Sequence, residues 1–401
     1  MFWGERVTRR RAIVGILALF ALADAGLAFA VLGGGREAAP VRAFPLHPAV
    51  GDFVPDGTQL GECSDEGCFQ QAFGNVAFYD GPKTALELAY DLYDDGANPA
   101  CHGVAHAIGA ASLALYRGDV ARTFADGSAV CWSGYYHGVL ERSLVNVRSR
   151  TPAALATVAN TLCGDSTARV VPWIAYQCNH GLGHGLMITT GVDLPLSLDV
   201  CKRLATWRDR DACKGGVFME NVAPSYGLHS RWLRDEDPVY PCNKVARADK
   251  RRCYLIVTSR ILPSVGDDWE RTAQICSEVE TDFVAICFQS FGRDASSRSD
   301  RDPAETAQLC VIAQSYGGES DCVAAAARDV TANFTSGLRA RALCDTVDEG
   351  LRGRCYYGIG TVMGQLRTSR VAREADCRAI VNAPHLVDEC LRGGRSTLPR
   401  S

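Results

Sequence analysis

The chain has 401 residues, enough for one long repeat array or two to three ordinary domains, and its apolar fraction of 47% is typical of a folded protein. The net charge is −4 and basic residues are scattered, so the sequence has no electrostatic footprint of a nucleic-acid-binding protein. Its eighteen cysteines, an even number, suit an oxidising compartment in which they pair.

The N-terminus predicts export. Residues 1–11 are a basic segment ending in three arginines, and residues 12–32 are an apolar run with one charge, Asp24. Such a run can cross a bilayer as a helix with the arginines left inside, so we expect a single-pass anchor in the cell membrane and a body outside the cytoplasm. A cleavable signal peptide and secretion are the alternative, because Ala28-Phe29-Ala30 fits the small-x-small rule. Residues 33–55, rich in Gly, Pro and Ala, then form a linker.

Residues 56–190 are expected to form a helical region that carries both cysteines and histidines. Its first four cysteines leave two pairings open. They could pair locally, as Cys63 with Cys68 and Cys101 with Cys131, or cross-pair as 68 with 101 and 63 with 131.

Five of the chain's eight histidines lie in this region and occupy two equivalent positions. They lie in three segments that start at a cysteine and align on a shared glycine: CHGVAHAIG, CWSGYYHGVLE and CNHGLGHGLM. The five are His102, His106, His137, His180 and His184. Two of the segments contain an HxxxH spacing, which places both imidazoles on one helix face within reach of one metal ion. The shared glycines predict close approach between helices.

Neighbouring helices about 8–10 Å apart would bring these histidines together, so the sequence predicts a transition-metal site. Imidazole suits Zn, Cu or Fe, and haem is less favoured because no CxxCH motif occurs. The alternative is that the histidines only make hydrogen bonds between repeats. Glu141 and Glu220 are weak candidates for a general base beside a metal-bound water, which would make the protein an enzyme. HExxH, GxSxG and P-loop motifs do not occur.

Residues 191–401 are expected to be helical-hairpin repeats, each closed by its own disulfide. From residue 163 onward the cysteines come in successive pairs, mostly 11 to 13 residues apart. The pairs are Cys163 and Cys178, Cys201 and Cys213, Cys242 and Cys253, Cys276 and Cys287, Cys310 and Cys322, Cys344 and Cys355, and Cys377 and Cys390. The first cysteine recurs at intervals of 38, 41, 34, 34, 34 and 33 residues, a period of helix–turn–helix solenoids.

One unit, residues 269–294, shows how a repeat is expected to fold. Apolar residues recur at helical spacing in both halves, and the second cysteine is expected to open the second helix, capped by Thr281-Asp282. Cysteines late in one helix and early in the next then face each other across a short turn, at the separation that a disulfide needs.

The period and the paired helices resemble the tetratricopeptide and Sel1-like superhelices, over roughly residues 150–395. The tetratricopeptide Trp-Leu-Gly-Tyr signature does not occur, so the resemblance concerns architecture. It implies an all-α solenoid, and its repeat face could hold a protein partner. The second functional hypothesis is therefore an interaction scaffold at the cell surface, with structural histidines and no metal.

Overall fold

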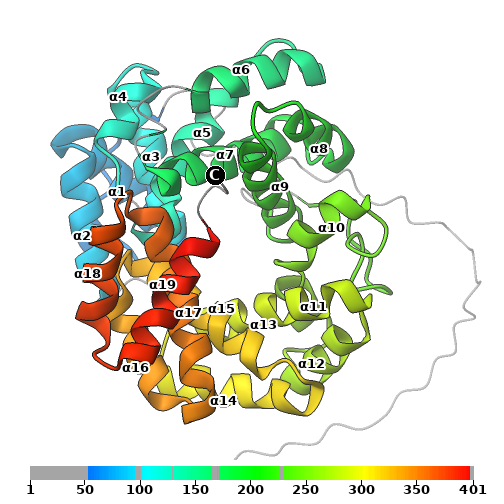
Figure 1. The fold of residues 1–401 in the computed structure, drawn as a ribbon. Coiled ribbons are helices and arrows are strands. Elements are labelled where there is room, and N and C mark those ends of the chain that lie inside the picture. The colour runs from blue at the N-terminus through cyan, green and yellow to red at the C-terminus, as the bar shows by residue number, and fades with distance from the viewer. Residues whose placement is uncertain are drawn as a thin grey trace, which may run out of the picture. The chain divides into compact units, whose positions relative to one another are not determined.

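The described part of the molecule is helical (Figure 1). The computed structural model describes residues 53–94, 101–128, 130–145, 147–164, 169, 171–224 and 229–397, and among these residues it contains no β-strand. The predicted segments 1–11 and 12–32, and the linker up to residue 52, lie outside the described residues. None of the described helices has the length and apolar character needed to span a membrane.

The helices fall into successive hairpins. Up to residue 222 they are α1 (Glu66–Asp80), α2 (Pro82–Asp94), α3 (Cys101–Leu115), α4 (Val120–Ala125), α5 (Gly134–Val145), α6 (Pro152–Gly164), α7 (Pro172–Thr189), α8 (Leu194–Lys202) and α9 (Trp207–Val222). The later helices are α10 (Arg247–Tyr254), α11 (Thr258–Ser264), α12 (Trp269–Glu278), α13 (Val284–Arg298), α14 (Pro303–Ile312), α15 (Glu319–Phe334), α16 (Gly337–Thr346), α17 (Glu349–Leu366), α18 (Arg370–Ile380) and α19 (Pro384–Ser396).

All seven cysteine pairs expected from the spacing are disulfide bonds in the structure. In a regular unit such as Cys310–Cys322, the first cysteine lies on one helix of the hairpin, α14, and the second on the next, α15. The Cα atoms of this pair are 5.5 Å apart and both cysteines are fully buried. Each disulfide therefore closes one hairpin at its turn.

The sequence left two pairings open for the first four cysteines, and the structure has the local pairing. Cys63 bonds to Cys68 and Cys101 bonds to Cys131. The remaining short helices are η1 (Leu60–Glu62), η2 (Cys131–Ser133), η5 (Thr281–Phe283) and η6 (Ala313–Tyr316).

The expected helix starts need a correction. The second cysteine lies inside its helix in most units, because the helix begins one to two turns earlier: α7 starts at Pro172, ahead of Cys178. In the unit of residues 269–294 the cap residue of α13 is Phe283, and no side chain caps it. Thr281 and Asp282 instead form the short helix η5 ahead of α13, so the predicted cap was wrong.

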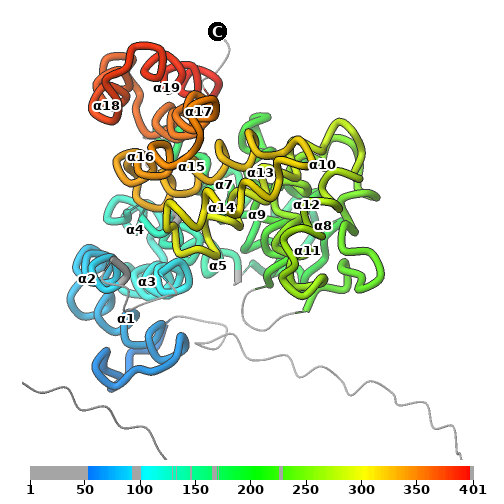
Figure 2. The backbone as a smooth tube through the Cα atoms, turned by 90° about the horizontal axis from the view of Figure 1, so that it is seen from below, coloured from blue at the N-terminus to red at the C-terminus, as the bar shows by residue number. Residues whose placement is uncertain are grey.

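Two runs of helices pack side by side in chain order (Figure 2). Contacts join α1 to α3, α3 to α5, α5 to α7 and α7 to α9, and again α13 to α15, α15 to α17 and α17 to α19. The short helices α10 and α11 connect these two runs. The first-cysteine helices make a second row, in which α12, α14, α16 and α18 contact one another in turn. We call the helices of the first two runs the inner helices: α1, α3, α5, α7, α9, α13, α15, α17 and α19.

Glycines allow the inner helices to approach closely. A Cβ on Gly216 of α9 would lie 1.9 Å from the carbonyl oxygen of His180 on α7. A Cβ on Gly183 of α7 would lie 2.1 Å from the carbonyl oxygen of Cys213 on α9. No side chain larger than hydrogen fits at such distances, so the helix spacing requires glycine. Side chains on neighbouring inner helices are thereby brought close enough to share one site.

Removing one internal disulfide should lower the stability of the whole array. For Cys310→Ala with Cys322→Ala we expect the free energy of unfolding to fall by about 3 kcal/mol, because the unfolded chain regains the entropy of a loop of about 12 residues. Urea unfolding of the oxidised protein measures this loss. The terminal pair Cys63→Ala with Cys68→Ala serves as control and should cost less, since it closes a shorter loop. An unchanged midpoint for the internal variant would contradict the expectation.

Candidate functional site

The histidines predicted from the sequence come together on three consecutive inner helices. Helix α3 carries one HxxxH pair, α5 carries the single histidine and α7 carries the second pair. The two predicted glutamates lie on α5 and α9, at the edges of the same group. We call the five histidines the histidine cluster: His102, His106, His137, His180 and His184.

The first histidine pair, His102 and His106, has its two Nε2 atoms 3.0 Å apart. The Nδ1 atom of each ring contacts an oxygen atom of another residue. His102 Nδ1 lies 2.8 Å from the carbonyl oxygen of Cys131, and His106 Nδ1 lies 2.9 Å from Oε1 of Glu141. Both oxygens are acceptors, so both Nδ1 atoms carry protons and the Nε2 atoms are the ones free to bind a metal.

The second histidine pair, His180 and His184, repeats this arrangement one helix pair further along. Its Nε2 atoms are 3.4 Å apart, and His184 Nδ1 lies 2.8 Å from Oε2 of Glu220 on α9. The Nδ1 edge of His180 faces the backbone of α9 at Ala212 and Gly215. Each histidine pair therefore has one ring oriented by a carboxylate and one whose Nδ1 faces backbone atoms: Cys131 for His102, and α9 for His180.

His137 lies between the two pairs. Its ring centroid is 5.4 Å from those of His102 and His106, and 5.1 and 5.2 Å from those of His180 and His184. Its Nε2 atom is 3.1 Å from Oε1 of a buried glutamine, Gln177 of α7. Its Nδ1 atom is buried and has no hydrogen-bond partner among the described residues.

Three histidines of the cluster, His102, His137 and His180, favour the neutral imidazole. Burial and the neighbouring histidines hold the pKa of His137 well below 6.5, and burial with the charge of His106 lowers the pKa of His102 to about 3. Burial also lowers the pKa of His180, helped by His184 and by Arg252. Burial also lowers the pKa of His106, but the charge of Glu141 outweighs this effect, so the pKa of His106 is raised. Neutral imidazole is the form that binds metals.

Two groups of side chains in the described residues could each hold a metal ion. One is His102, His106 and His137, and the other is Glu141, His184 and Glu220, whose ligand atoms all lie within 4.8 Å of one another. The carboxylates of Glu141 and Glu220 are almost completely buried, at 1% and 0% exposure. Buried anions need nearby positive charge, which a metal ion would supply.

Helices α17 and α19 repeat the backbone packing of α7 and α9 without the histidines. A Cβ on Gly360 would lie 1.9 Å from the carbonyl oxygen of Cys390, and one on Gly393 would lie 2.1 Å from that of Tyr357. These contacts correspond to those of Gly183 and Gly216 in the histidine-bearing pair.

The residues that replace the cluster in α17 and α19 cannot bind a transition metal in this way. They are Tyr357 for His180, Thr361 for His184 and Thr397 for Glu220. Close packing of inner helices therefore requires the glycines but does not require the histidines. This argues against a purely structural role for the histidine cluster.

Sequence reasoning missed two residues at the site, Gln177 and Tyr176. Gln177 is buried against His137, and the ring of Tyr176 stacks on His180 with centroids 5.6 Å apart. Gln177 precedes His180 by three residues and His184 by seven, so the helical spacing already placed it on the cluster face. His229 and His385, which lack a partner pattern in the sequence, are exposed.

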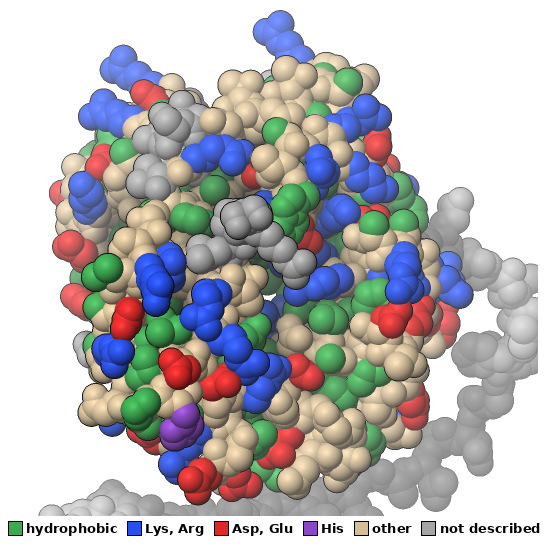
Figure 3. All heavy atoms as spheres, viewed as in Figure 1, with side chains coloured by type: hydrophobic (Ala, Val, Ile, Leu, Met, Phe, Trp, Pro, Cys, Tyr) green, Lys and Arg blue, Asp and Glu red, His purple; other side chains and the backbone are tan. Residues whose placement is uncertain are grey.

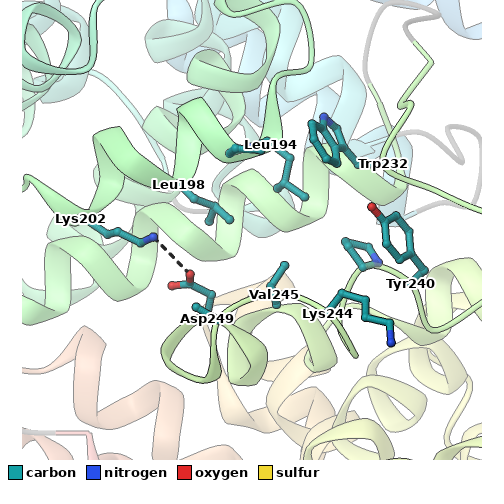
Figure 4. Close-up of a pocket in the computed structure, with 11 residues that line it drawn as sticks. Leu194, Leu198, Lys202, Trp232, Tyr240, Lys244, Val245 and Asp249 are labelled. Carbon is teal, nitrogen blue, oxygen red and sulfur yellow. Dashed lines mark ion pairs between the residues drawn. The ribbon is translucent and has the colours of Figure 1, made fainter.

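A separate cavity of about 280 Å³ lies between α8 and the segment leading into α10 (Figure 4). Its walls include Leu194, Leu198 and Trp232. At one end Lys202 approaches the buried carboxylate of Asp249 to 3.6 Å. No residue of the histidine cluster lines this cavity.

No protein-family model, curated protein or solved structure matches the chain. The geometry of the site therefore carries the functional argument by itself.

Proposed function

We propose that the protein is an extracytoplasmic metalloprotein whose histidine cluster binds a transition metal, Zn, Cu or Fe. One observation carries the proposal. Two pairs of imidazole Nε2 atoms face each other at 3.0 and 3.4 Å, and oxygen acceptors hold Nδ1 of His106 and His184 behind them. Oriented imidazoles at this separation can close on an ion with little rearrangement.

The glutamates fit best as residues that position the histidines. Each carboxylate accepts a hydrogen bond from Nδ1, which fixes the ring and strengthens Nε2 as a ligand. This role differs from the general base considered from the sequence, although either carboxylate could also reach an ion held at His184. A bound metal would supply Lewis acidity or redox chemistry that no side chain of the cluster has alone.

An extracytoplasmic location fits the disulfides. All eighteen cysteines are in disulfide bonds, and a reducing cytoplasm would not maintain them. We propose that residues 12–32 anchor the protein in the cell membrane and that the hairpins form a disulfide-closed αα solenoid resembling tetratricopeptide and Sel1-like superhelices. In that arrangement the C-terminal repeats stabilise the array beside the metal centre.

The test is elemental analysis of the oxidised full-length protein, purified without a His-tag or chelator. We expect at least one equivalent of transition metal per chain, and none in the variant His106→Ala, His137→Ala, His184→Ala. Circular dichroism and intact disulfides must show that the variant is folded. If it does not fold, His180→Tyr with His184→Thr is the second variant, because Tyr357 and Thr361 occupy the equivalent positions of α17, and it should hold less metal per chain than the native protein.

A native protein that stays empty after incubation with Zn, Cu and Fe would contradict the proposal. The histidines would then be packing residues. The interaction scaffold, with a protein partner on the repeat face, would become the better account.

A further inference from the structure

Three guanidinium groups gather beside the second histidine pair. Arg251 and Arg252 belong to α10 and Arg328 to α15, and each interacts electrostatically with Tyr176 of α7, whose ring centroid lies 5.6 Å from Cζ of Arg252. Because the ring of Tyr176 stacks on His180, this group of arginines adjoins the histidine cluster. We call Arg251, Arg252 and Arg328 the arginine cluster.

Helix packing explains why these residues meet. Trp173, on the turn of α7 before Tyr176, belongs to a small buried cluster with Ala332, on the turn of α15 after Arg328, and with Val362 of α17. Residues three or four apart share a helix face, so Tyr176 and Arg328 lie on the faces of α7 and α15 that contribute to this cluster. From the other side, Nη1 of Arg252 donates a hydrogen bond of 3.3 Å to the hydroxyl oxygen of Tyr176.

The positive charge of the arginine cluster is not fully balanced. Arg252 pairs with Asp211 of α9. Within the described residues no carboxylate lies at ion-pair distance from Arg328, and the neighbouring Asp329 accepts instead from Ser296. Burial and the charges of Arg251 and Arg252 lower the pKa of Arg328 to about 10. Like charges held together in a partly buried place favour a bound anion.

The donors around Tyr176 suit a carboxylate or phosphate group. The hydroxyl oxygen of Tyr176 accepts from Arg252, which leaves its own proton to donate. Arg252 and Arg328 are both partly exposed, so an anion can reach them from solvent. Figure 3 shows Lys and Arg side chains gathered across the middle of the face seen in Figure 1, where a basic surface would attract such a molecule.

We propose that the arginine cluster, through Arg328 and Tyr176, binds a carboxylate or phosphate group of the molecule that the metal centre receives. The proposal rests on the proposed metal-binding function. It assigns the chemical class of the ligand. The ligand is an anion whose charged group lies at Tyr176 and whose remaining part reaches past His180 to the histidine cluster. A planar guanidinium recognises both oxyanions by paired hydrogen bonds.

The test is calorimetric titration of the full-length protein, whose metal content has been measured, with inorganic phosphate and separately with succinate. The variant is Arg328→Gln, and the matched control is Arg271→Gln, the same charge change on an exposed arginine of α12. We expect the Kd of at least one anion to rise about 10- to 100-fold in Arg328→Gln, because a charged hydrogen-bond donor is lost. Metal content should stay unchanged, and Arg271→Gln should bind as the native protein does.

Metal-loaded native protein that binds neither anion would overturn this inference while leaving the metal centre intact. Equal affinities for Arg328→Gln and Arg271→Gln would overturn it as well. A protein without metal that still binds an anion through Arg328 would instead overturn the proposed function and its link to the arginine cluster. The anion with the lower Kd identifies whether the group is a phosphate or a carboxylate.

Discussion

Native protein should bind two metal ions per chain, and the variant His180→Tyr, His184→Thr should keep one. The two histidine pairs lie on different helices, α3 and α7. Each has facing Nε2 atoms and its own carboxylate behind one ring. His137 lies between them at similar distances from both. Each pair can therefore form a centre of its own, with His137 available to either.

Metal equivalents per chain measure this prediction directly. The complementary variant, His102→Gln with His106→Gln, should also keep one ion. Unchanged circular dichroism in both variants is the control for folding. If either variant loses all metal, both pairs and His137 instead serve a single ion, and the expectation of two centres is wrong.

Replacing Gly358 with alanine should destabilise the protein strongly, whereas replacing Gly350 in the same helix should not. A Cβ on Gly358 of α17 would lie 2.1 Å from the carbonyl oxygen of Ala324 on α15. The two helices would have to move apart, at a cost of about 1–3 kcal/mol or more for overpacking. Gly350 is exposed and has no atom within 4 Å of its added Cβ, so alanine there should stabilise α17 by roughly 0.5–1 kcal/mol.

Urea unfolding of the two variants and of the native protein measures the two changes in the free energy of unfolding, which are expected to have opposite signs. Because both substitutions are Gly→Ala in one helix, helix propensity alone predicts the same effect for both. A stabilised Gly358→Ala would show that the inner helices are not held at the spacing that glycine permits.

The hairpins were predictable because their signal is local. Cysteines 11 to 15 residues apart readily become neighbours across a short turn, and seven successive pairs predicted both the helical class and the disulfides. The HxxxH spacing likewise places each histidine pair on one helix face, because residues four apart lie one turn above each other. The first four cysteines carry no such period, so the choice of Cys101–Cys131 over a cross-pairing needed the folded chain.

The functional arrangement depends on which helices become neighbours, and that is a tertiary property. The sequence suggested Glu141 as a general base beside a metal-bound water. The structure joins it to His106 on α3 instead, since close packing through glycine brings the faces of α3 and α5 together. The same holds for Glu220, whose partner His184 lies on α7.

The sequence by itself determined that this chain is built of disulfide-closed helical hairpins and that three of its segments carry histidines in register. Only the tertiary structure decided that the Nε2 atoms face one another with carboxylates behind them, and that Arg252 of α10 meets Tyr176 of α7. The physical reason is separation along the chain. Periodicity reports contacts within one helix or one hairpin, whereas the site joins residues from helices that only packing brings side by side.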